Sequence, residues 1–357
     1  MDTFYKERKL SAVDAQFEAN KIAFGPVLFQ ASKVLIDLGI LDLILDKNNG
    51  GISYEEIAQE KGISLYGLKV LLEMALSADI VKLNSEDKFQ LTKTGYFLLT
   101  DKCSRINMDF VHDVCYEGLF HLKEAITEEK PSGLKVFGEW NTVYEALAHL
   151  PEKVKESWFA FDHLYSDGAF PEALPIVFKH SPKKLLDVGG NTGKFSLQCV
   201  KYNPDVNVTI LDLPGQWEKA KGNIEAQGYA DRISGHPIDL LSENPIFPKG
   251  ADAIWMSQFL DCFSEDEIVK ILSAAVKGME EHTELFIMET YWDRQRFDAA
   301  AYCLHGTSLY FTAIANGNSR MYHADTMKLC CEKAGLNIVE DIDRVGEYHT
   351  IFRCKKK

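Results

Sequence analysis

An apolar run, an acid and a glycine-rich turn stand together near the middle of this 357-residue chain. The run at residues 185–188 contains Asp187 and leads into residues 189–193, which read GGNTG, before an amphipathic segment begins. Strand, glycine-rich turn and helix in this order bring a nucleotide-like ligand against bare backbone, because glycine has no Cβ to hold the ligand away. We therefore predict a ligand site that includes Asp187, Gly189 and Gly193.

The positions of the glycines distinguish a dinucleotide from S-adenosylmethionine (SAM). A dinucleotide fingerprint counted from Gly189 requires further glycines where this chain has asparagine and lysine. Asp187 would repel a phosphate and favours a cation. The next predicted strand, residues 208–211, ends in Asp212, and an acid there can accept hydrogen bonds from both hydroxyls of a ribose. SAM carries a ribose and a positive charge but no phosphate, so it is the predicted cofactor. An NAD-dependent enzyme and a plain strand-to-helix turn are the alternatives.

The composition is that of a globular protein with about two domains, 46% hydrophobic and 26% charged. A net charge of −14 argues against a nucleic-acid partner, because neutralising phosphates requires clustered Lys and Arg. The eight cysteines form no C-x-x-C pair or zinc spacing, so no metal is predicted. With no signal peptide and no apolar run near the roughly 18 residues that span a bilayer, we expect a cytoplasmic protein without a membrane partner.

Residues 1–105 predict a helical domain that ends in a small hairpin. A capping box, Ser53 with Glu56, begins one of its helices, and Gly39 breaks another. Apolar spacing predicts helices at 23–45 and 65–78 and strands at 80–83 and 89–92. This is a winged-helix pattern. A DNA-binding regulator is one interpretation, but the second helix offers only Lys69 as a base, so we expect the domain to pack against a second subunit.

Residues 106–180 are predicted to form a helical connector that contributes to a substrate pocket. Helices are expected at 110–126, 143–147 and 152–170. The last of these is rich in aromatic residues and carries Phe161 and His163, which suits the roof of a pocket for a flat aromatic acceptor. A core helix with one polar edge is the alternative.

Residues 181–357 predict an α/β domain with a parallel sheet and helices on both faces, because short apolar runs alternate regularly with helical patterns. The last two runs, 337–339 and 349–352, are separated by a short turn at Gly346. Strands so close in sequence can pair only antiparallel. A parallel sheet closed by an antiparallel hairpin is typical of Rossmann-like class I methyltransferases, which is the predicted fold class.

Four short motifs extend this picture. Residues 186–193 read LDVGGNTG, residues 211–214 read LDLP, residues 121–125 read HLKEA, and Asp162 is followed by His163. These resemble the D-V-G-G-G-T-G, F-D-L-P, H-L-K-D-A and D-H motifs of small-molecule O-methyltransferases of the plant caffeic-acid type and their bacterial hydroxyneurosporene-type relatives. The resemblance spans nearly the whole chain. It implies a homodimer formed through the N-terminal domain, whose partner subunit helps to line the substrate pocket.

The resemblance also implies roles for particular residues. The implied contacts to SAM are Gly189, Asp212, Leu213, Asp239, Leu240, Ser257 and Gln258, with Asp239 and Leu240 beside the adenine and the last two near the methionine end. On the acceptor side, Asn316 best matches a family position that contacts the acceptor. Tyr302 and His305, in the same aromatic-rich segment, are further candidates.

One departure from the family concerns the catalytic base. The family histidine lies in a motif like L-K-H-V-L-H-D-W-S-D-E, whereas residues 256–266 of this chain read MSQFLDCFSED, so Asp261 stands at the histidine position. A supporting glutamate is retained as Glu289, but the second one, expected near residues 320–321, is absent from the sequence. An acid at the N-terminal end of a helix, favoured by the helix dipole, is the alternative interpretation of Asp261.

The chemistry of Asp261 leaves three interpretations open. An ordinary aspartate, with a pKa of about 3.9, is a weak base toward a phenol of pKa about 10, but burial and the nearby Glu289 would raise its pKa. Asp261 is then the base for O-methylation of a small aromatic or polyketide-like acceptor, which we expect. It would otherwise orient a phenol for C-methylation of the ring, or the fold binds SAM without transferring a methyl group.

Overall fold

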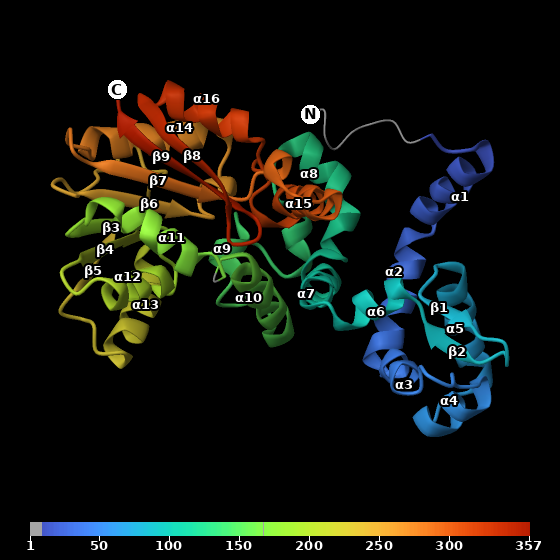
Figure 1. Cartoon of the computed structure of the whole chain (residues 1–357). Helices are drawn as coiled ribbons and strands as arrows, with labels where there is room; N and C mark the ends of the chain where they lie inside the picture. The colour runs from blue at the N-terminus through green and yellow to red at the C-terminus, as the bar shows by residue number, and fades with distance from the viewer. Residues whose placement is uncertain (1–8, 167) are drawn as a thin grey trace. The chain divides into compact units, whose positions relative to one another are not determined.

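The computed structural model describes residues 9–166 and 168–357. The chain divides into two compact units, with the boundary between His112 and Asp113 (Figure 1). None of the helices in the described ranges is both long and apolar enough to cross a membrane.

The N-terminal unit consists of helices around a small hairpin. Its helices are α1 (Ala12–Ala23), α2 (Gly25–Asp37), α3 (Ile40–Asp46), α4 (Tyr54–Lys61), α5 (Leu65–Ser77), α6 (Lys93–Thr100) and α7 (Lys102–Phe110). Strands β1 (Val81–Leu83) and β2 (Phe89–Leu91) pair antiparallel, as predicted. Gly39, at a φ of 64°, separates α2 from α3, and the capping box of Ser53 and Glu56 is formed at the start of α4. The predicted break and the predicted cap are therefore confirmed.

The C-terminal unit is an α/β domain. Its strands are β3 (Lys184–Val188), β4 (Asn207–Asp212), β5 (Ile233–Pro237), β6 (Ala253–Ser257), β7 (Glu284–Glu289), β8 (Leu336–Val345) and β9 (His349–Lys356). Its α-helices are α8 (Leu122–Glu128), α9 (Val143–Ala146), α10 (Glu152–Ser166), α11 (Phe170–Val177), α12 (Lys194–Tyr202), α13 (Pro214–Ala226), α14 (Glu265–Gly278), α15 (Asp298–Tyr310) and α16 (Ala324–Lys333).

Within the described residues, the strands of this unit form a single sheet in the order β5-β4-β3-β6-β7-β9-β8. The pairs from β5 to β7 are parallel, whereas β9 pairs antiparallel with both β7 and β8. The chain order reverses between β3 and β6, and in open α/β sheets such a switch point opens a crevice at the carboxyl ends of the strands. The predicted fold class, including the antiparallel last strand, is confirmed.

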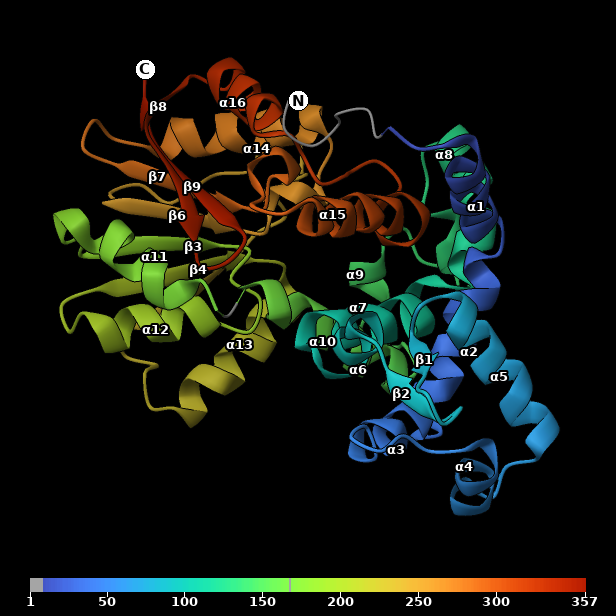
Figure 2. The same cartoon turned by 45° about the vertical axis from the view of Figure 1, so that its right-hand side comes forward.

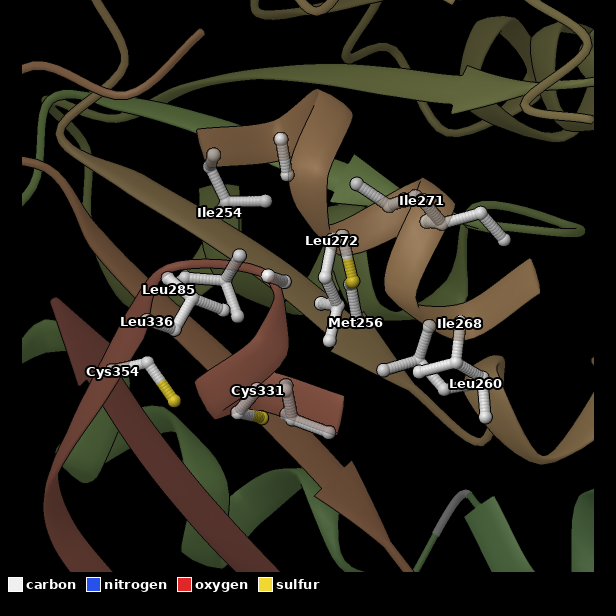
Figure 3. Packing of buried hydrophobic residues seen from close by; sticks show 14 of the residues in the cluster. Ile254, Met256, Leu260, Ile268, Ile271, Leu272, Leu285, Cys331, Leu336 and Cys354 are labelled. Atoms are coloured by element: carbon white, nitrogen blue, oxygen red, sulfur yellow. The ribbon is translucent and has the colours of Figure 1, made fainter. Parts of the chain in front are cut away.

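Helices cover both faces of the sheet. In Figures 1 and 2, α14 and α16 lie on one side and α11, α12 and α13 on the other. Side chains of each strand alternate between these layers, as the period of two requires. On β6, Ile254 and Met256 pack with α14 and α16, while Trp255 packs on the opposite face with Phe195 of α12. Figure 3 shows the first layer, where Ile268 contributes from α14. Burying each such Ile or Leu side chain contributes roughly 1.5–3 kcal/mol.

Two predicted helices of the connector are wrong in extent. The helix expected at 110–126 is a π-helix at Val111–Cys115, a 3-10 helix at Gly118–His121 and then α8. A Cβ at Gly118 would lie 2.9 Å from Ile314 and 3.1 Å from the carbonyl oxygen of Gly133, so distant segments approach the backbone here. The helix expected at 152–170 ends at Ser166, and α11 starts anew at Phe170 after a position outside the described residues.

Candidate active site

A larger and a smaller cavity open at the carboxyl ends of the parallel strands in the C-terminal unit. The larger has a volume of about 550 Å³ and the smaller about 80 Å³. They share Asp162, Gly189, Asn191 and Gln258 in their walls, so they form one site with two compartments. The larger volume falls in the range of small-molecule pockets.

The glycine-rich turn after β3 forms part of both walls through Gly189. This residue adopts a φ of 70°, and a Cβ in its place would overlap the ring of Phe259, which follows β6. Its N–H donates to the carbonyl oxygen of Leu211 at 2.8 Å. Gly193, at a φ of 78°, is the N-cap of α12 and lines neither cavity. Glycine at 189 is therefore required both by the backbone and by the neighbouring ring.

Asp187 lies at the end of β3 in the wall of the smaller cavity. Its carboxyl group is almost completely buried and accepts a hydrogen bond of 2.6 Å from the hydroxyl group of Ser196. Burial raises the pKa of Asp187 to about 7, because desolvation disfavours the charged form. His163, Lys194 and Ser257 line the same cavity. This compartment therefore combines acids and bases, as the zwitterionic end of an amino acid requires.

Asp212, at the end of β4, lies in the wall of the larger cavity. One carboxyl oxygen accepts the N–H of Asn191 at 2.9 Å, and the other accepts the N–H of Leu213 at 2.7 Å. Burial raises the pKa of Asp212, whereas these two hydrogen bonds act in the opposite direction. Each oxygen keeps a further lone pair, so the carboxylate is held in place for a pair of hydroxyl donors. Asp239 and Leu240, after β5, line the same cavity.

The two cavities fit SAM on features of the chain itself. Gln216 and Gln258 line the larger cavity and Ser257 the smaller, and each has a buried side-chain oxygen without a hydrogen bond within the described chain. Buried polar atoms are normally satisfied, so these oxygens point to a polar ligand. Together with the diol-binding geometry at Asp212 and the mixed charges of the smaller cavity, they match an adenosyl group joined to an amino acid.

Asp261 and Glu289 form a buried acidic pair beside the larger cavity. Asp261, on a 3-10 turn at Leu260–Cys262, lines the cavity and is 7% exposed. Burial raises the pKa of Asp261 to about 6. Burial also raises the pKa of Glu289 well above its ordinary range, and the charge of Asp261 adds to this. Glu289 is therefore expected to be the protonated member near neutral pH, while Asp261 titrates between acidic and neutral conditions.

Aromatic side chains surround the rest of the larger cavity. The indole N–H of Trp158 on α10 donates to the hydroxyl group of Tyr310 on α15 at 2.7 Å. The rings of Phe161 and Tyr165 meet edge to face at 5.2 Å between centroids. The side-chain amide of Asn316 donates to the carbonyl oxygen of Cys262 at 2.6 Å, which anchors the turn that carries Asp261. These walls suit a flat ring system.

The structure brings most of the predicted site residues together. Lining the larger cavity are Phe161, Gly189, Asp212, Leu213, Asp239, Leu240, Gln258, Asp261 and Asn316. Lining the smaller are His163, Asp187, Gly189, Ser257 and Gln258. Glu289 lies behind the cavity wall, where it accepts hydrogen bonds from the segment that carries Asp261.

Two predicted substrate residues lie away from both cavities. The side chain of Tyr302 is 79% exposed on α15, and His305 packs beside Trp292 at 5.0 Å between ring centroids. Both belong to a helix whose opposite side faces the cavity, a distinction that residue type alone does not give. Conversely, Tyr144 and Thr290 lie in the wall of the larger cavity but are not among the predicted site residues. Thr290 follows Glu289 directly, so its place at a strand end was a usable signal, whereas nothing local marks Tyr144.

Comparison with known proteins matches two families to the chain. A Dimerisation2-like domain matches residues 16–89, and an O-methyltransferase domain matches residues 119–336. Among curated relatives, the L-tyrosine C(3)-methyltransferase of Streptomyces lavendulae is 24% identical over 320 residues, which cover 88% of this chain and 85% of that protein.

Solved structures share the fold. The SAM-dependent methyltransferase SibL in its apo form has a TM-score of 0.71 at 20% identity, covering 94% of this chain and 98% of that one. The O-methyltransferase NcsB1 from neocarzinostatin biosynthesis, in complex with SAM and 2-hydroxy-5-methyl naphthoic acid, has a TM-score of 0.64 at 17% identity, covering 92% and 96%. Because the O-methyltransferase domain matches more than half of the residues, the chain belongs to this family and is a SAM-dependent methyltransferase.

Proposed function

We propose that the protein transfers the methyl group of SAM to a hydroxyl group of a small aromatic or polyketide-like acceptor, with Asp261 as the general base. The observation that carries the proposal is the position of Asp261, a buried carboxyl in the wall of an aromatic cavity, with a pKa raised by burial to about 6. A base is most effective when its pKa lies near the working pH.

SAM supplies an electrophilic methyl group on a positively charged sulfur, and the residues of the chain hold and orient it. Asp212 would accept the ribose hydroxyls, and Asp239 with Leu240 would flank the adenine. Asp187, Gly189, Ser257 and Gln258 would face the methionine end, and Leu213 would close the site beside Asp212. The support for these roles is the set of polar atoms without partners and the mixture of charges described above.

Asp261 takes the proton of the acceptor hydroxyl, which leaves an oxygen nucleophile. Glu289 positions Asp261 through the backbone. One oxygen of Glu289 accepts hydrogen bonds from the N–H groups of Phe259 at 3.1 Å and Leu260 at 2.9 Å. Aromatic residues around the cavity exclude water from the reacting groups. Phe161 and Asn316 would contact the acceptor, and His163 would act from the smaller compartment, next to Asp162, which lines both.

C-methylation is the second candidate, because one relative is named for transfer to C(3) of L-tyrosine. In that reaction Asp261 would take the phenol proton, and the ring carbon beside the oxygen would take the methyl group and then lose its own proton while the oxygen regains one, which restores the phenol. The product distinguishes the two: isotope-labelled methyl groups give different carbon chemical shifts on oxygen and on an aromatic carbon.

The N-terminal unit supports a homodimer. None of the residues of α1 is buried. Its apolar side chains are largely exposed, with Val13 at 75% and Ile22 at 80%. Phe17, Phe24 and Val27 are also more than half exposed. Exposed apolar patches of this kind mark interfaces, and the match to a Dimerisation2-like domain agrees with this. Several points stay predictions: the winged-helix form of this unit, the domain boundaries at 105 and 180, the cytoplasmic location, metal independence and the absence of a nucleic-acid partner.

The function is tested with methyl-labelled SAM and a panel of hydroxylated aromatic compounds. We expect label on the oxygen of at least one acceptor, together with binding of S-adenosylhomocysteine by calorimetry. Binding of that product without any transfer would leave a SAM-binding protein. Absence of both would overturn the proposal.

A further inference from the structure

The walls of the two cavities differ in charge. Among the described residues that line the larger cavity there is no lysine, arginine or histidine. Two of its acids, Asp212 and Asp239, are assigned above to the adenosine part of SAM, and the remaining acids are Glu145, Asp162, Asp261 and Glu267. The smaller cavity has Lys194 and His163 beside its acids. Among the described lining residues, the basic side chains therefore lie in the compartment that is assigned above to the amino-acid end of SAM.

Acids act on the aromatic wall where the acceptor would lie. Burial raises the pKa of Tyr310 well above its ordinary value, and the charge of Asp162 acts in the same direction. Burial likewise raises the pKa of Tyr144, and the charge of Asp261 adds to it. Both tyrosines line the cavity. Asp162 and Asp261 therefore act on the aromatic part of the cavity wall.

A separate feature also points to a ligand with N–H or O–H donors. Thr290 lines the larger cavity, is only 2% exposed, and its hydroxyl oxygen makes no hydrogen bond within the described chain. A buried hydroxyl without a partner costs free energy, so the native site provides one from outside the chain. The hydroxyl can both donate and accept, so its oxygen can accept a hydrogen bond from an ammonium group of a ligand.

An aromatic and acidic wall is the chemistry that recognises an ammonium group. The faces of Trp, Tyr and Phe rings attract a cation, and carboxylates pair with it directly. A carboxylate or phosphate in the same place would lose its hydration without gaining any positive partner. Asp162 lies beside the imidazole of His163, with 3.8 Å between Oδ2 and Nδ1. The single positive charge on the sulfur of SAM can offset only one further acid among Glu145, Asp261 and Glu267.

We propose that the acceptor is an aromatic compound that carries a protonated amine and no carboxylate or phosphate. This proposal rests on the proposed function. The ammonium group pairs with the acids of the larger cavity and packs on its rings, while the hydroxyl group to be methylated faces Asp261. The chain thereby selects its acceptor by charge as well as by shape.

The test uses three phenols that differ only in the charge of the side arm: 4-(2-aminoethyl)phenol, 4-(2-hydroxyethyl)phenol and 4-hydroxyphenylacetate. Each is titrated into the full-length protein with and without saturating S-adenosylhomocysteine. We expect the ammonium probe to bind at least tenfold more tightly than the carboxylate probe, with the neutral probe between them. Equal or tighter binding of the carboxylate probe, or no binding of the ammonium probe, overturns the proposal.

Variants assign the preference to the wall. Glu145→Gln and Asp162→Asn should each reduce the ratio of ammonium to neutral affinity at least threefold. Glu218→Gln, an exposed acid on α13 that lines neither cavity, should leave the ratio unchanged. A ratio that no wall variant moves contradicts the assignment. Binding of S-adenosylhomocysteine is measured in the same experiment, so loss of the proposed function is recognised separately from loss of the charge preference.

Discussion

The backbone N–H of Leu260 donates a hydrogen bond of 2.9 Å to the carboxyl group of Glu289. This bond joins the turn after β6 to the end of β7, and the residue that follows Leu260 is Asp261. The carboxyl group of Glu289, at the end of β7, thus holds the backbone of the turn that presents the carboxyl group of Asp261. Glu289 accepts hydrogen bonds from the backbone of this turn, whereas Asp261 lines the larger cavity and accepts one from the thiol of Cys262 at 3.5 Å.

Asp261→Asn should lower turnover by roughly 100-fold or more, because general-base catalysis contributes about that factor. The affinity for S-adenosylhomocysteine should stay within about twofold of the unmodified protein. Steady-state rates and calorimetry measure the two quantities. Asp266→Asn, an exposed acid in the first turn of α14, is the matched control and should keep normal turnover. Normal turnover in Asp261→Asn would exclude it as the base.

The rate should depend on pH through Asp261. Burial raises the pKa of this residue to about 6, and only its deprotonated form can accept a proton. The rate constant should therefore be low at pH 5, rise through pH 6 and level off near pH 7 to 8. A pH–rate profile checks this, and the limb near pH 6 should be missing from the residual activity of Asp261→Asn. A profile without any change between pH 5 and 7 would contradict the assignment.

Glu289 offers a test of its protonation and of its positioning role. Because burial and the charge of Asp261 keep the pKa of Glu289 high, Glu289→Gln replaces a neutral acid by a neutral amide that still accepts hydrogen bonds. Turnover should fall less than about tenfold, and the limb near pH 6 should stay in place. Glu289→Ala removes the acceptor for two backbone N–H groups, so turnover should fall much further. Equal losses in both variants would argue for a catalytic charge on Glu289.

Asp212→Ala should weaken the binding of S-adenosylhomocysteine by roughly 10- to 100-fold, which corresponds to hydrogen bonds to a charged group of about 1.5–3 kcal/mol. Isothermal titration calorimetry measures the change directly. Asp231→Ala, an exposed acid that lines neither cavity, should bind as the unmodified protein does. The 2′-deoxy analogue of S-adenosylhomocysteine is titrated into Asp212→Ala and Asp231→Ala as well. If its affinity is lower than that of the parent compound by the same factor in both variants, Asp212 does not hold the ribose.

Gly189→Ala should abolish measurable binding of S-adenosylhomocysteine, because the new Cβ would overlap Phe259. Gly193→Ala has a similar φ, but its Cβ would lie 3.4 Å from Ile224, so it should show the backbone cost of roughly 1–2 kcal/mol with binding largely kept. Gly250→Ala, also at a φ of 78°, reports the same backbone cost away from the site. Thermal unfolding and calorimetry together separate strain from overlap.

Much of the sheet could be predicted because its central strands are short apolar runs with clear ends. Strands β3 and β4, predicted at 185–188 and 208–211, fall within about one residue of the prediction. Strand β8 was predicted only at 337–339, although it extends from Leu336 to Val345. It is an edge strand in which only the two end residues are buried and those between are half-buried or exposed, and its many acids hide the apolar period.

The candidate site was predictable where strand ends carry acids, as at Asp187 and Asp212, whereas Asp261 was predicted through its place in the family motif. Helix α15 shows the limit of this reasoning. Tyr302 and Tyr310 lie on the same helix and are both aromatic, yet one is 79% exposed and the other 5%. Which side of a helix faces a cavity depends on the elements packed around it, and the aromatic-rich sequence of α15 has little amphipathic pattern to indicate this.

A side chain at position 189 would overlap the ring of Phe259. The two loops that carry these residues are 70 positions apart in the chain, yet each limits which residue the other can hold. A smaller residue at 259 would make room for a Cβ at 189, so the effect of changing either position depends on what occupies the other. The two positions carry a joint constraint, and single substitutions measured separately will not add.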